Sequence, residues 1–512
     1  MKKIGVLGLV AFLLLATASM SFALEIKAKG YWWIESVMKN NWDFLGKGAA
    51  SGEDKTFNIE QKMRTQFHFI ANENLRAVFD TQIGSSNWGN GLYSIGAGRS
   101  AGTQTAGQAP AGSGSNANAA GAGNIMLRQG YMEYRWPSTL VNFKVGFQTL
   151  SLPSAFGGGS PILDDQVAAA VVSAPITGNV SLLVGYARPF DSNSNAFTTA
   201  SNISGGGTST DIVFAAVPVS FKGATITPFA AYAHAGADTY APGVGAPGLA
   251  GFMGPNSSGG QGLRSYWGGV AATVTALDNF KFMGDFNYGK ATYNNPSAND
   301  NKAGRQGFMF DAAVDYTGLS MMTPQVFFTY SSGENGNSSK GGTSERMPVV
   351  GAPQFWTIGS FFFGERLELG GSINNSAGYT SNTLGYWAAG ISLKDMTFVD
   401  KLSHTFNLLY ARGTNDKKYI YETGGTIRNA NYGGFLTTED SLWEVDLNSR
   451  YKIYDELTLL VYLGYINANF DKDVWGDLST VATTASAATA ADIKRYGSSN
   501  AYKVGVGLNY FF

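Results

Sequence analysis

The chain has no cysteine in its 512 residues, and only 14% of the residues are charged. Without cysteine there can be no disulfide bond, no c-type haem attachment and no thiolate metal site on this chain. The formal net charge is −1, and such a balance gives no basis for binding nucleic acid or an anionic membrane surface. The stability of the fold must therefore come from something other than covalent cross-links.

The sequence also lacks long apolar runs after its first residues. A transmembrane helix needs about 18 or more consecutive apolar residues, and no segment after residue 23 approaches this. Residues 1–23 carry a basic start, Met1-Lys2-Lys3, then an apolar stretch from Ile4 to Thr17 and a small-x-small site at Ser21-Phe22-Ala23. This pattern predicts a Sec signal peptide that is cleaved after Ala23, because the apolar stretch is too short for an anchor.

What the chain does contain is glycine and aromatic residues, with 66 Gly and 13% Phe, Trp and Tyr. Apolar residues alternate with polar ones over many short stretches, which predicts strands with one apolar face. The clearest example runs from Phe57 to Ala71 and is followed by the tight turn Asn72-Glu73-Asn74. Its apolar face carries Phe57, Ile59, Met63, Phe67 and Phe69, and its polar face carries Asn58, Glu60, Lys62, Arg64, Gln66 and His68.

The last segment, Tyr502 to Phe512, has the same alternation and stops on an aromatic residue. Every second residue counted back from the end is apolar or aromatic: Phe512, Tyr510, Leu508, Val506, Val504 and Tyr502. In an exported chain, such a strand is typical of the closing strand of an outer-membrane β-barrel. We expect the barrel-assembly machinery to bind this strand.

Short turns and long loops alternate along the chain, which allows a strand count. Short turns are expected near Asn72, Pro137, Thr177, Lys222, Leu277, Gly318, Val399 and Asp455, and nine longer Gly-rich loops lie between them. Together they join eighteen antiparallel strands over residues 24–512, with both ends in the periplasm and the long loops outside the cell. Sixteen strands remain possible, because Ala168–Ala187 and Ile212–Tyr232 are the weakest hairpins.

A soluble β-sandwich also has alternating strands. Here, however, the apolar face repeats along the whole chain, with no second apolar set to pack against it. Aromatic residues gather near the strand ends, as a lipid-interface girdle requires: Trp136, Tyr186, Tyr316, Tyr454 and Phe512. The sequence therefore predicts an all-β transmembrane barrel, and a barrel of this size encloses an aqueous channel unless something fills it. No globular domain is expected before the first strand at about Leu24, so no plug is expected.

The third long loop, residues 150–166, is apolar at its ends and has three glycines in the middle. This composition predicts a loop that folds inward against the wall and constricts the pore. Its neighbouring carboxylates Asp164 and Asp165 would then form an acidic rim, whereas in an exposed loop they would be ordinary surface aspartates. The polar faces of the early strands are basic, and those of the middle strands are acidic. The predicted pore-lining residues are Lys62, Arg64, Arg76 and Lys144 on the basic side and Asp285, Asp311 and Asp315 on the acidic side.

A basic wall that faces acidic groups would set a transverse field across the channel and bias ion choice. Alternatively, these charges simply keep a wet interior solvated. No reaction chemistry is expected, because no Ser/His/Asp set can be assembled. The three histidines, His68, His234 and His404, lie on different predicted strands, so we expect neither a metal site nor a cofactor.

Several stretches resemble the outer-membrane homotrimeric porins of sulfate- and metal-reducing bacteria. They are Ile26 to Trp33, Phe57 to Ile83, the loop from Leu152 to Asp165, and the terminal Tyr510-Phe511-Phe512. The resemblance implies a homotrimer in which the third loop narrows each pore. It gives a constriction role to Asp164 and Asp165 alone.

The sequence thus favours a passive diffusion porin of the Gram-negative outer membrane, which is not an enzyme and which passes small hydrophilic solutes and ions. Its partners would be membrane lipid, the solutes and two further copies of the chain. A substrate-specific channel is the first alternative and would need a ladder of aromatic or arginine side chains along the lumen. A structural barrel that sheathes an electron-transfer partner is the second.

Overall fold

The structure is a computed structural model, and it describes residues 24–41, 44, 55–88, 125–156, 159–191, 209–236, 262–294, 302–335, 342–350, 385–418, 436–476, 494–495, 497 and 499–512. The predicted signal peptide, residues 1–23, lies outside these residues, as do most of the long loops. Within the described part of the chain, no helix is long and apolar enough to cross a membrane.

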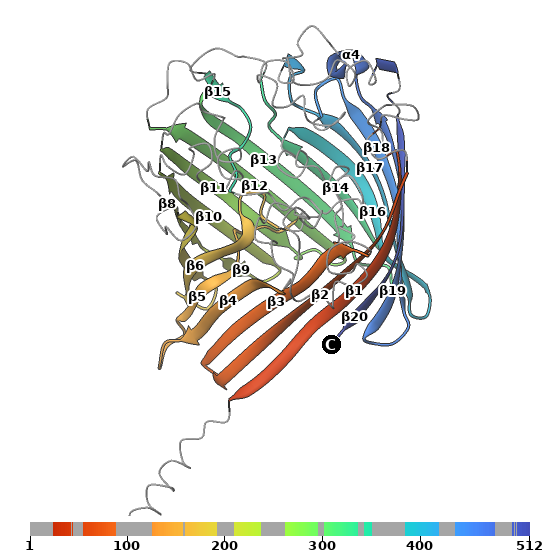
Figure 1. Cartoon of the computed structure of the whole chain (residues 1–512). Coiled ribbons are helices and arrows are strands. Elements are labelled where there is room, and N and C mark those ends of the chain that lie inside the picture. Colours follow the sequence, from red (N-terminus) through yellow and green to blue (C-terminus); the bar gives the residue numbers. More distant parts are fainter. Residues whose placement is uncertain are drawn as a thin grey trace, which may run out of the picture.

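The described residues form a single sheet of long strands (Figure 1). Its first half consists of β1 (Glu25–Asn40), β2 (Lys55–Asn72), β3 (Leu75–Asn87), β4 (Ile125–Arg135), β5 (Asn142–Ser151), β6 (Asp164–Pro175), β7 (Ser181–Asp191), β8 (Ser209–Ala216), β9 (Val219–Phe221) and β10 (Ala224–Ala235). Its second half consists of β11 (Leu263–Val274), β12 (Phe280–Tyr293), β13 (Lys302–Tyr316), β14 (Thr323–Ser331), β16 (Tyr386–Val399), β17 (Leu402–Gly413), β18 (Ser441–Lys452), β19 (Leu457–Asn469) and β20 (Asn500–Phe511).

The sheet closes on itself as an antiparallel barrel. Each strand pairs with its neighbour in the chain, and β20 pairs with β1 from Tyr31 opposite Phe511 to Asn40 opposite Tyr502. β8 and β9 both pair with β10, so they form one wall strand with a break at 217–218. The described wall therefore has eighteen strands, which confirms the predicted fold class. Closure leaves no strand edge unpaired, and this is the condition for a sheet to cross a membrane.

The strand count is confirmed at its weakest points. The hairpins β6–β7 and β8–β10, which the sequence marks least clearly, are both part of the wall. Among the described residues, two short elements lie outside the wall, at the end opposite the short turns (Figure 1). β15 (Gly342–Ser344) pairs in parallel with the start of β13, and α4 (Lys472–Trp475) follows β19.

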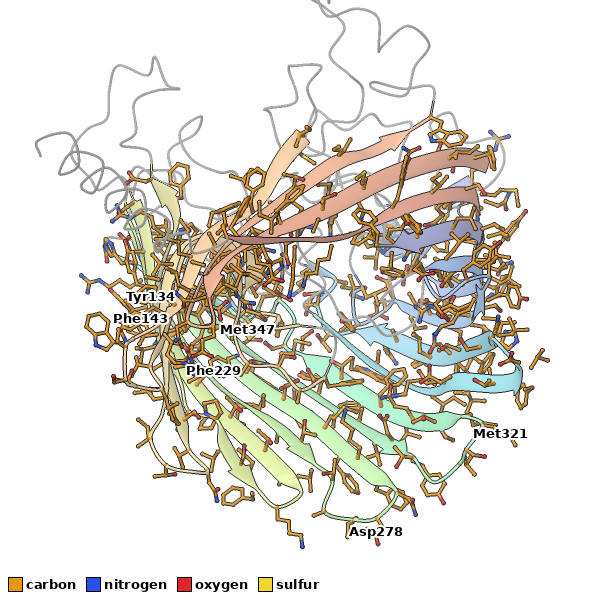
Figure 2. The ribbon with its side chains drawn as sticks, turned by 90° about the horizontal axis from the view of Figure 1, so that it is seen from below. Tyr134, Phe143, Phe229, Asp278, Met321 and Met347 are labelled. Atoms are coloured by element: carbon orange, nitrogen blue, oxygen red, sulfur yellow. The ribbon has the colours of Figure 1, made fainter. Side chains whose placement is uncertain are left out.

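The outward face of the barrel is apolar and is bordered by aromatic rings. Near the short-turn end, the rings of Tyr134 and Phe143 stack at 4.9 Å on the outside of the wall (Figure 2). Near the long-loop end, neighbouring strands place aromatic residues side by side, among them Tyr232, Tyr266, Tyr288, Phe308, Tyr330, Trp387, Tyr410 and Trp443. An exposed apolar belt between two aromatic rows is the surface that a barrel presents to lipid.

Barrel closure depends on a close approach at Gly30. Its backbone N–H donates to the Phe512 carbonyl at 2.8 Å, and the Phe512 N–H donates back to the Gly30 carbonyl at 3.0 Å. A Cβ on Gly30 would lie 2.1 Å from the Arg64 carbonyl oxygen and 2.8 Å from the Phe512 ring. The seam between the first and last strands therefore leaves no room for a side chain at this position.

We expect Gly30→Val to lower the yield of folded barrel strongly, because the new side chain would displace the backbone of β2 at the seam. Heat-modifiable migration on gels measures the folded fraction. Gly268→Ala is the matched control, since a Cβ there would meet only the Phe229 carbonyl oxygen, at 3.9 Å. Equal folded fractions for the two variants would show that the seam tolerates a side chain.

Candidate functional site: a constriction inside the barrel

The loop between β5 and β6 leaves the wall and runs through the lumen. Its ends are joined at the root, where the Leu152 N–H donates to the Leu163 carbonyl at 3.0 Å. The loop leads into β6, the sixth wall strand, but the part farthest from its root reaches β12, the eleventh. We call residues 152–156 and 159–163 the inward loop.

Asp285 on β12 fastens the inward loop to the wall. Its carboxylate accepts the Ala155 N–H at 2.8 and 3.0 Å, the Phe156 N–H at 2.9 Å and the Ser154 hydroxyl at 3.2 Å. The Phe156 ring packs 6.4 Å from the ring of Phe327 on β14. Because these contacts cross between segments far apart in the chain, they fix the inward loop across one side of the channel.

A second segment, residues 345–350 after β15, also enters the lumen. The Val350 N–H donates to the Ile162 carbonyl at 2.7 Å, so the two inward segments are bonded to each other. The Trp267 indole N–H on β11 donates to the Pro348 carbonyl at 2.7 Å. Met347 is fully buried and lies within the ring of strands (Figure 2). The sequence analysis did not predict this segment.

The inner wall behind these segments is apolar. From β6 to β11 the inward positions carry small and aromatic side chains, all buried: Val167, Ala169, Ala187, Ile212, Phe214, Phe229, Ala231, Ala233 and Trp267. Leu152, Ile162 and Leu163 of the inward loop pack against them. Burial of apolar surface contributes about 25 cal/mol per Å², so this internal core holds the two segments in place. The β6–β13 side of the lumen is thus filled by protein.

The two aspartates predicted to form the acidic rim lie at the root of the inward loop, as the first residues of β6. In the β5–β6 register Asp165 lies opposite Leu150, and Asp164 lies opposite Ser151. Consecutive strand residues point to opposite faces of a sheet. Asp165 therefore shares the inward face with Leu150 and Val167, whereas the Asp164 carboxylate packs against Gly159 of the inward loop, where an added Cβ would meet it at 2.1 Å. Both carboxylates are half-buried.

The predicted basic residues fall into two groups. Lys62 and Arg64 lie next to the aromatic residues of β1: the Lys62 Nζ is 5.0 Å from the Trp33 ring, and the Arg64 guanidinium is 5.7 Å from the Tyr31 ring. The Arg64 Nε also donates to Gln82 at 2.7 Å. Such contacts between cations and rings hold the charges along the inner wall.

The second group lies nearer the short-turn end. Arg76 forms an ion pair with Glu133 at 2.6 Å, and Lys144, which lies opposite Glu133 in the register, is 4.3 Å from the Tyr131 ring. Arg64 and the β2 position opposite Arg76 are six residues apart, which is roughly 20 Å along a strand. The four basic residues therefore do not form one cluster.

The predicted acidic residues all lie on the inward face, and each is buried and engaged. Asp285 holds the inward loop, and Asp311 lies opposite it on β13. Asp315 accepts the Lys394 ammonium at 2.9 Å and the Gln325 amide at 2.6 Å. Their exposed fractions are 2%, 1% and 5%. Asp285 braces the inward loop and Asp315 braces the wall, and none of the three carboxylates faces open water as an acidic pore lining would.

Arg128 on β4 is an inward residue that the sequence analysis missed. It sits at a β-bulge, where the register passes from Asp80 opposite Gln129 to Thr81 opposite Leu127. Its charge interacts with those of Arg64, Asp80 and Asp165. Since a bulge inserts one extra residue into a strand, simple alternation assigns Arg128 to the wrong face. Arg64 and Arg128 thus approach the root of the inward loop from the early-strand side of the lumen.

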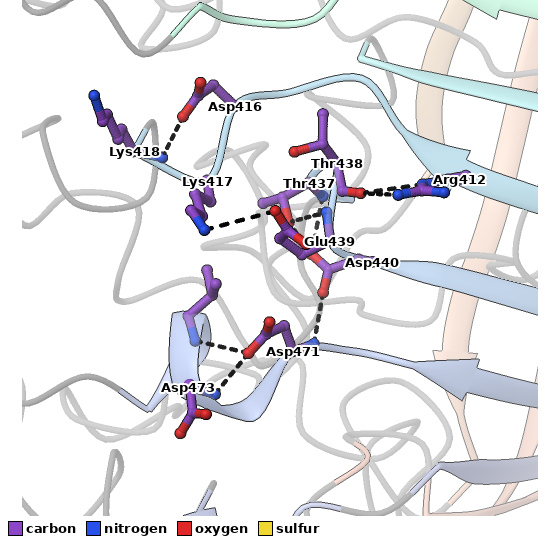
Figure 3. A network of polar contacts seen from close by, with 11 residues as sticks. Arg412, Asp416, Lys417, Lys418, Thr437, Thr438, Glu439, Asp440, Asp471 and Asp473 are labelled. Carbon is purple, nitrogen blue, oxygen red and sulfur yellow. Dashed lines mark hydrogen bonds and ion pairs between the residues drawn. The ribbon is translucent and has the colours of Figure 1, made fainter.

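A rim network ties the long-loop ends of several strands together (Figure 3). Asn415 donates to the carbonyls of Gly385 and Leu436 and accepts the Glu334 N–H. Asp440, just before the start of β18, accepts the Thr437 hydroxyl at 2.7 Å, the Asp471 N–H at 2.8 Å and the Trp475 indole N–H at 3.1 Å. These contacts join the segments that flank β14, β16, β18 and β19 at the mouth.

Asp440 makes the rim network sensitive to pH. Burial raises the pKa of this carboxyl to about 6, against the opposing effect of its hydrogen bonds. Its folded pKa thus exceeds the unfolded value of about 3.9. The resulting stabilisation is complete below the unfolded pKa and is lost as pH rises through the folded pKa. We expect the free energy of local opening at 436–440, measured by native-state hydrogen exchange, to fall between about pH 4 and 7, and to change less in Asp440→Asn.

Comparisons with known proteins add little at the level of sequence. No protein-family model matches the chain, and no curated protein matches it in sequence. Solved structures similar to it include OpdQ of Pseudomonas aeruginosa, with 9% identity over 95% of this chain and 98% of that chain and a TM-score of 0.47. OprD of Pseudomonas aeruginosa has 10% identity over 95% and 93% of the two chains and a TM-score of 0.47. A BenF-like porin of Pseudomonas fluorescens Pf-5 has 9% identity over 96% and 100%, also at 0.47. No residue role or solute is transferred from proteins this remote.

Proposed function

We propose that the protein is an outer-membrane channel through which small hydrophilic solutes diffuse, with selection by size and charge at the constriction. The single observation that carries this proposal is the inward loop, which Asp285 holds across the lumen through three backbone and side-chain donors. A loop fixed in this way narrows the lumen of an eighteen-strand barrel. The apolar belt and aromatic rows of the outward face support a position in a membrane.

Within this class, the geometry favours a substrate-selective channel over the general diffusion porin that the sequence favoured. Two inward segments and an apolar core occupy the β6–β13 side of the lumen, so we place the passage along the polar early strands. There Arg64, against the Tyr31 ring, and Arg128 are half-buried, whereas Lys62 is buried against the Trp33 ring. Guanidinium groups bind carboxylates and phosphates through paired hydrogen bonds, so we propose small anionic solutes as the preferred cargo.

Liposome swelling tests this proposal. Proteoliposomes are challenged with solutes of matched size that are neutral, anionic or cationic. We expect the anionic solute to enter fastest. Solutes that are a few ångström wider than this matched set should be excluded. Equal entry rates for the neutral, anionic and cationic solutes would favour a general diffusion porin instead. No swelling with any solute would favour a barrel that is filled by a partner.

The roles of Asp164 and Asp165 and the homotrimer remain proposals. Asp165 faces the same side as Arg128 and interacts with its charge, so we assign the acidic part of the constriction to Asp165. Cross-linking of the protein in native membranes tests the trimer. A ladder that ends at three chains supports it, and a ladder that never exceeds one chain contradicts it.

A further inference from the structure

A groove on the outside of the barrel has no part in solute passage. It lies at the long-loop end between β11 and β12, has a volume of about 660 Å³ and is lined by Arg264, Tyr266, Lys290, Thr292, Tyr293 and Asn294. In the register, Arg264 lies opposite Thr292, and Tyr266 lies opposite Lys290. These four side chains are exposed, and they alternate with the buried inward residues Ser265 and Ala291.

The two cations of the groove are placed to share one anion. Arg264 and Lys290 are diagonal neighbours on adjacent strands, and the Cβ atoms of such neighbours are roughly 7–8 Å apart. Side chains as long as these can converge on one group over that distance. The Tyr266 and Thr292 hydroxyls lie on the other diagonal and can donate to the same anion.

Both cations lack a carboxylate partner within the part of the chain that the structure describes. Among the described residues, the outward faces of β8 and β10–β13 carry a single carboxylate, that of Asp211. It lies two strands from Arg264, with His234 between them in the register. Asp211 is already engaged, because it accepts Arg188 Nε at 2.8 Å and the Ser209 hydroxyl at 2.6 Å.

The groove lies at the height of the upper aromatic row. Tyr266 is 52% exposed, and its ring is 5.0 Å from that of Tyr232 on the neighbouring strand. Tyr288, one outward position below Lys290, is 43% exposed. Aromatic rows of this kind mark the depth of lipid headgroups. A cationic groove at this depth on a lipid-facing wall faces the headgroup layer and is turned away from the channel.

We propose that this groove binds the phosphate of a phosphorylated lipid in the outer leaflet, with Arg264 and Lys290 as the charged contacts and Tyr266 and Thr292 as hydrogen-bond donors. The assignment rests on the orientation in the proposed function, in which the long loops face the outside of the cell. It does not depend on whether the channel conducts.

Native mass spectrometry of the purified barrel in detergent tests the proposal with a phosphorylated glycolipid as the probe. Loss of charge-assisted hydrogen bonds in Arg264→Ala plus Lys290→Ala is expected to lower affinity about tenfold or more. Arg188→Ala is the matched control: it removes an outward arginine at the same end whose charge Asp211 and Asp191 already neutralise. We expect it to leave affinity unchanged.

Further arms separate the possible outcomes. The charge-preserving variant Arg264→Lys plus Lys290→Arg should still bind the phosphorylated lipid. The dephosphorylated lipid should bind the wild type weakly, with the affinity that the phosphorylated lipid has for the double alanine variant. Equal binding of the two lipids would overturn the phosphate contact. Competition by inorganic phosphate at a similar concentration would show a free-anion site and overturn the lipid assignment. Swelling rates of the double alanine variant should stay unchanged, so a failure here is distinct from a failure of the channel proposal.

Discussion

Asp285→Ala is expected to raise single-channel conductance severalfold, because it removes the acceptor that holds the inward loop. The carboxylate takes two backbone N–H groups and one hydroxyl from Ser154, Ala155 and Phe156. Each hydrogen bond to a charged group contributes about 1.5–3 kcal/mol. Without them, the outer part of the inward loop is free to move away from β12 and widen the passage.

Planar-bilayer recording with Asp315→Ala as the control checks this prediction. Asp315 also lies on the inward face of the middle strands and forms an ion pair with Lys394, but its contacts are to the wall. Its replacement tests the effect of losing a buried carboxylate without freeing the inward loop. If both variants conduct like the wild type, Asp285 does not hold the constriction.

The second large effect is expected from Arg64→Ala combined with Arg128→Ala. The charge of Arg128 interacts with those of Arg64 and Asp165 at the root of the inward loop, so removal of the two cations leaves the acidic side of the constriction dominant. A narrow passage with low-dielectric walls amplifies such a change in fixed charge. Reversal potentials under a salt gradient should shift from anion toward cation preference.

Arg76→Ala is the matched control for this pair. Arg76 is also an inward arginine of the early strands, but Glu133 neutralises it at 2.6 Å near the short-turn end. We expect its loss to change selectivity only slightly. A shift as large as that of the double variant would mean that selection occurs near the short turns and away from the inward loop.

The architecture could be predicted from the sequence because a barrel wall has a strict period of two. The closing strand from Tyr502 to Phe512 shows that period clearly, and turns such as Asn72-Glu73-Asn74 mark where strands end. Each turn expected from the sequence joins two strands of the described wall. A period of two also assigns most residues to a face, which placed Lys62, Arg64 and Asp285 inside the barrel.

The filled side of the lumen could not be predicted in the same way. Where the inward face packs against other protein, it becomes apolar, and the alternation fades. This is why the hairpins Ala168–Ala187 and Ile212–Tyr232 read weakly: their inward residues, such as Ala187, Ile212 and Phe214, form the internal core. Weak alternation of apolar and polar residues, in a chain whose other strands clearly predict a barrel, was thus the available signal for an inner core. It did not reveal which segments cover that core.

Two local features were beyond a pattern of alternation. The bulge at Arg128 shifts the faces by one residue, and nothing in the neighbouring sequence announces it. The pair Asp164 and Asp165 was assigned to a loop, although both lie at the start of β6, where Asp165 shares the inward face with Leu150 and Asp164 packs against Gly159 of the inward loop. The residues that hold the constriction, Ser154 to Phe156 on one side and Asp285 on the other, are joined only by the fold.

The most direct test of the account is single-channel conductance of the wild-type protein in planar bilayers, with neutral polymers of graded size added to find the widest one that enters. The account predicts discrete openings, with exclusion of polymers that are narrower than an unfilled eighteen-strand barrel. A folded, heat-modifiable barrel that never conducts, or one that admits every polymer an empty barrel would admit, would contradict it.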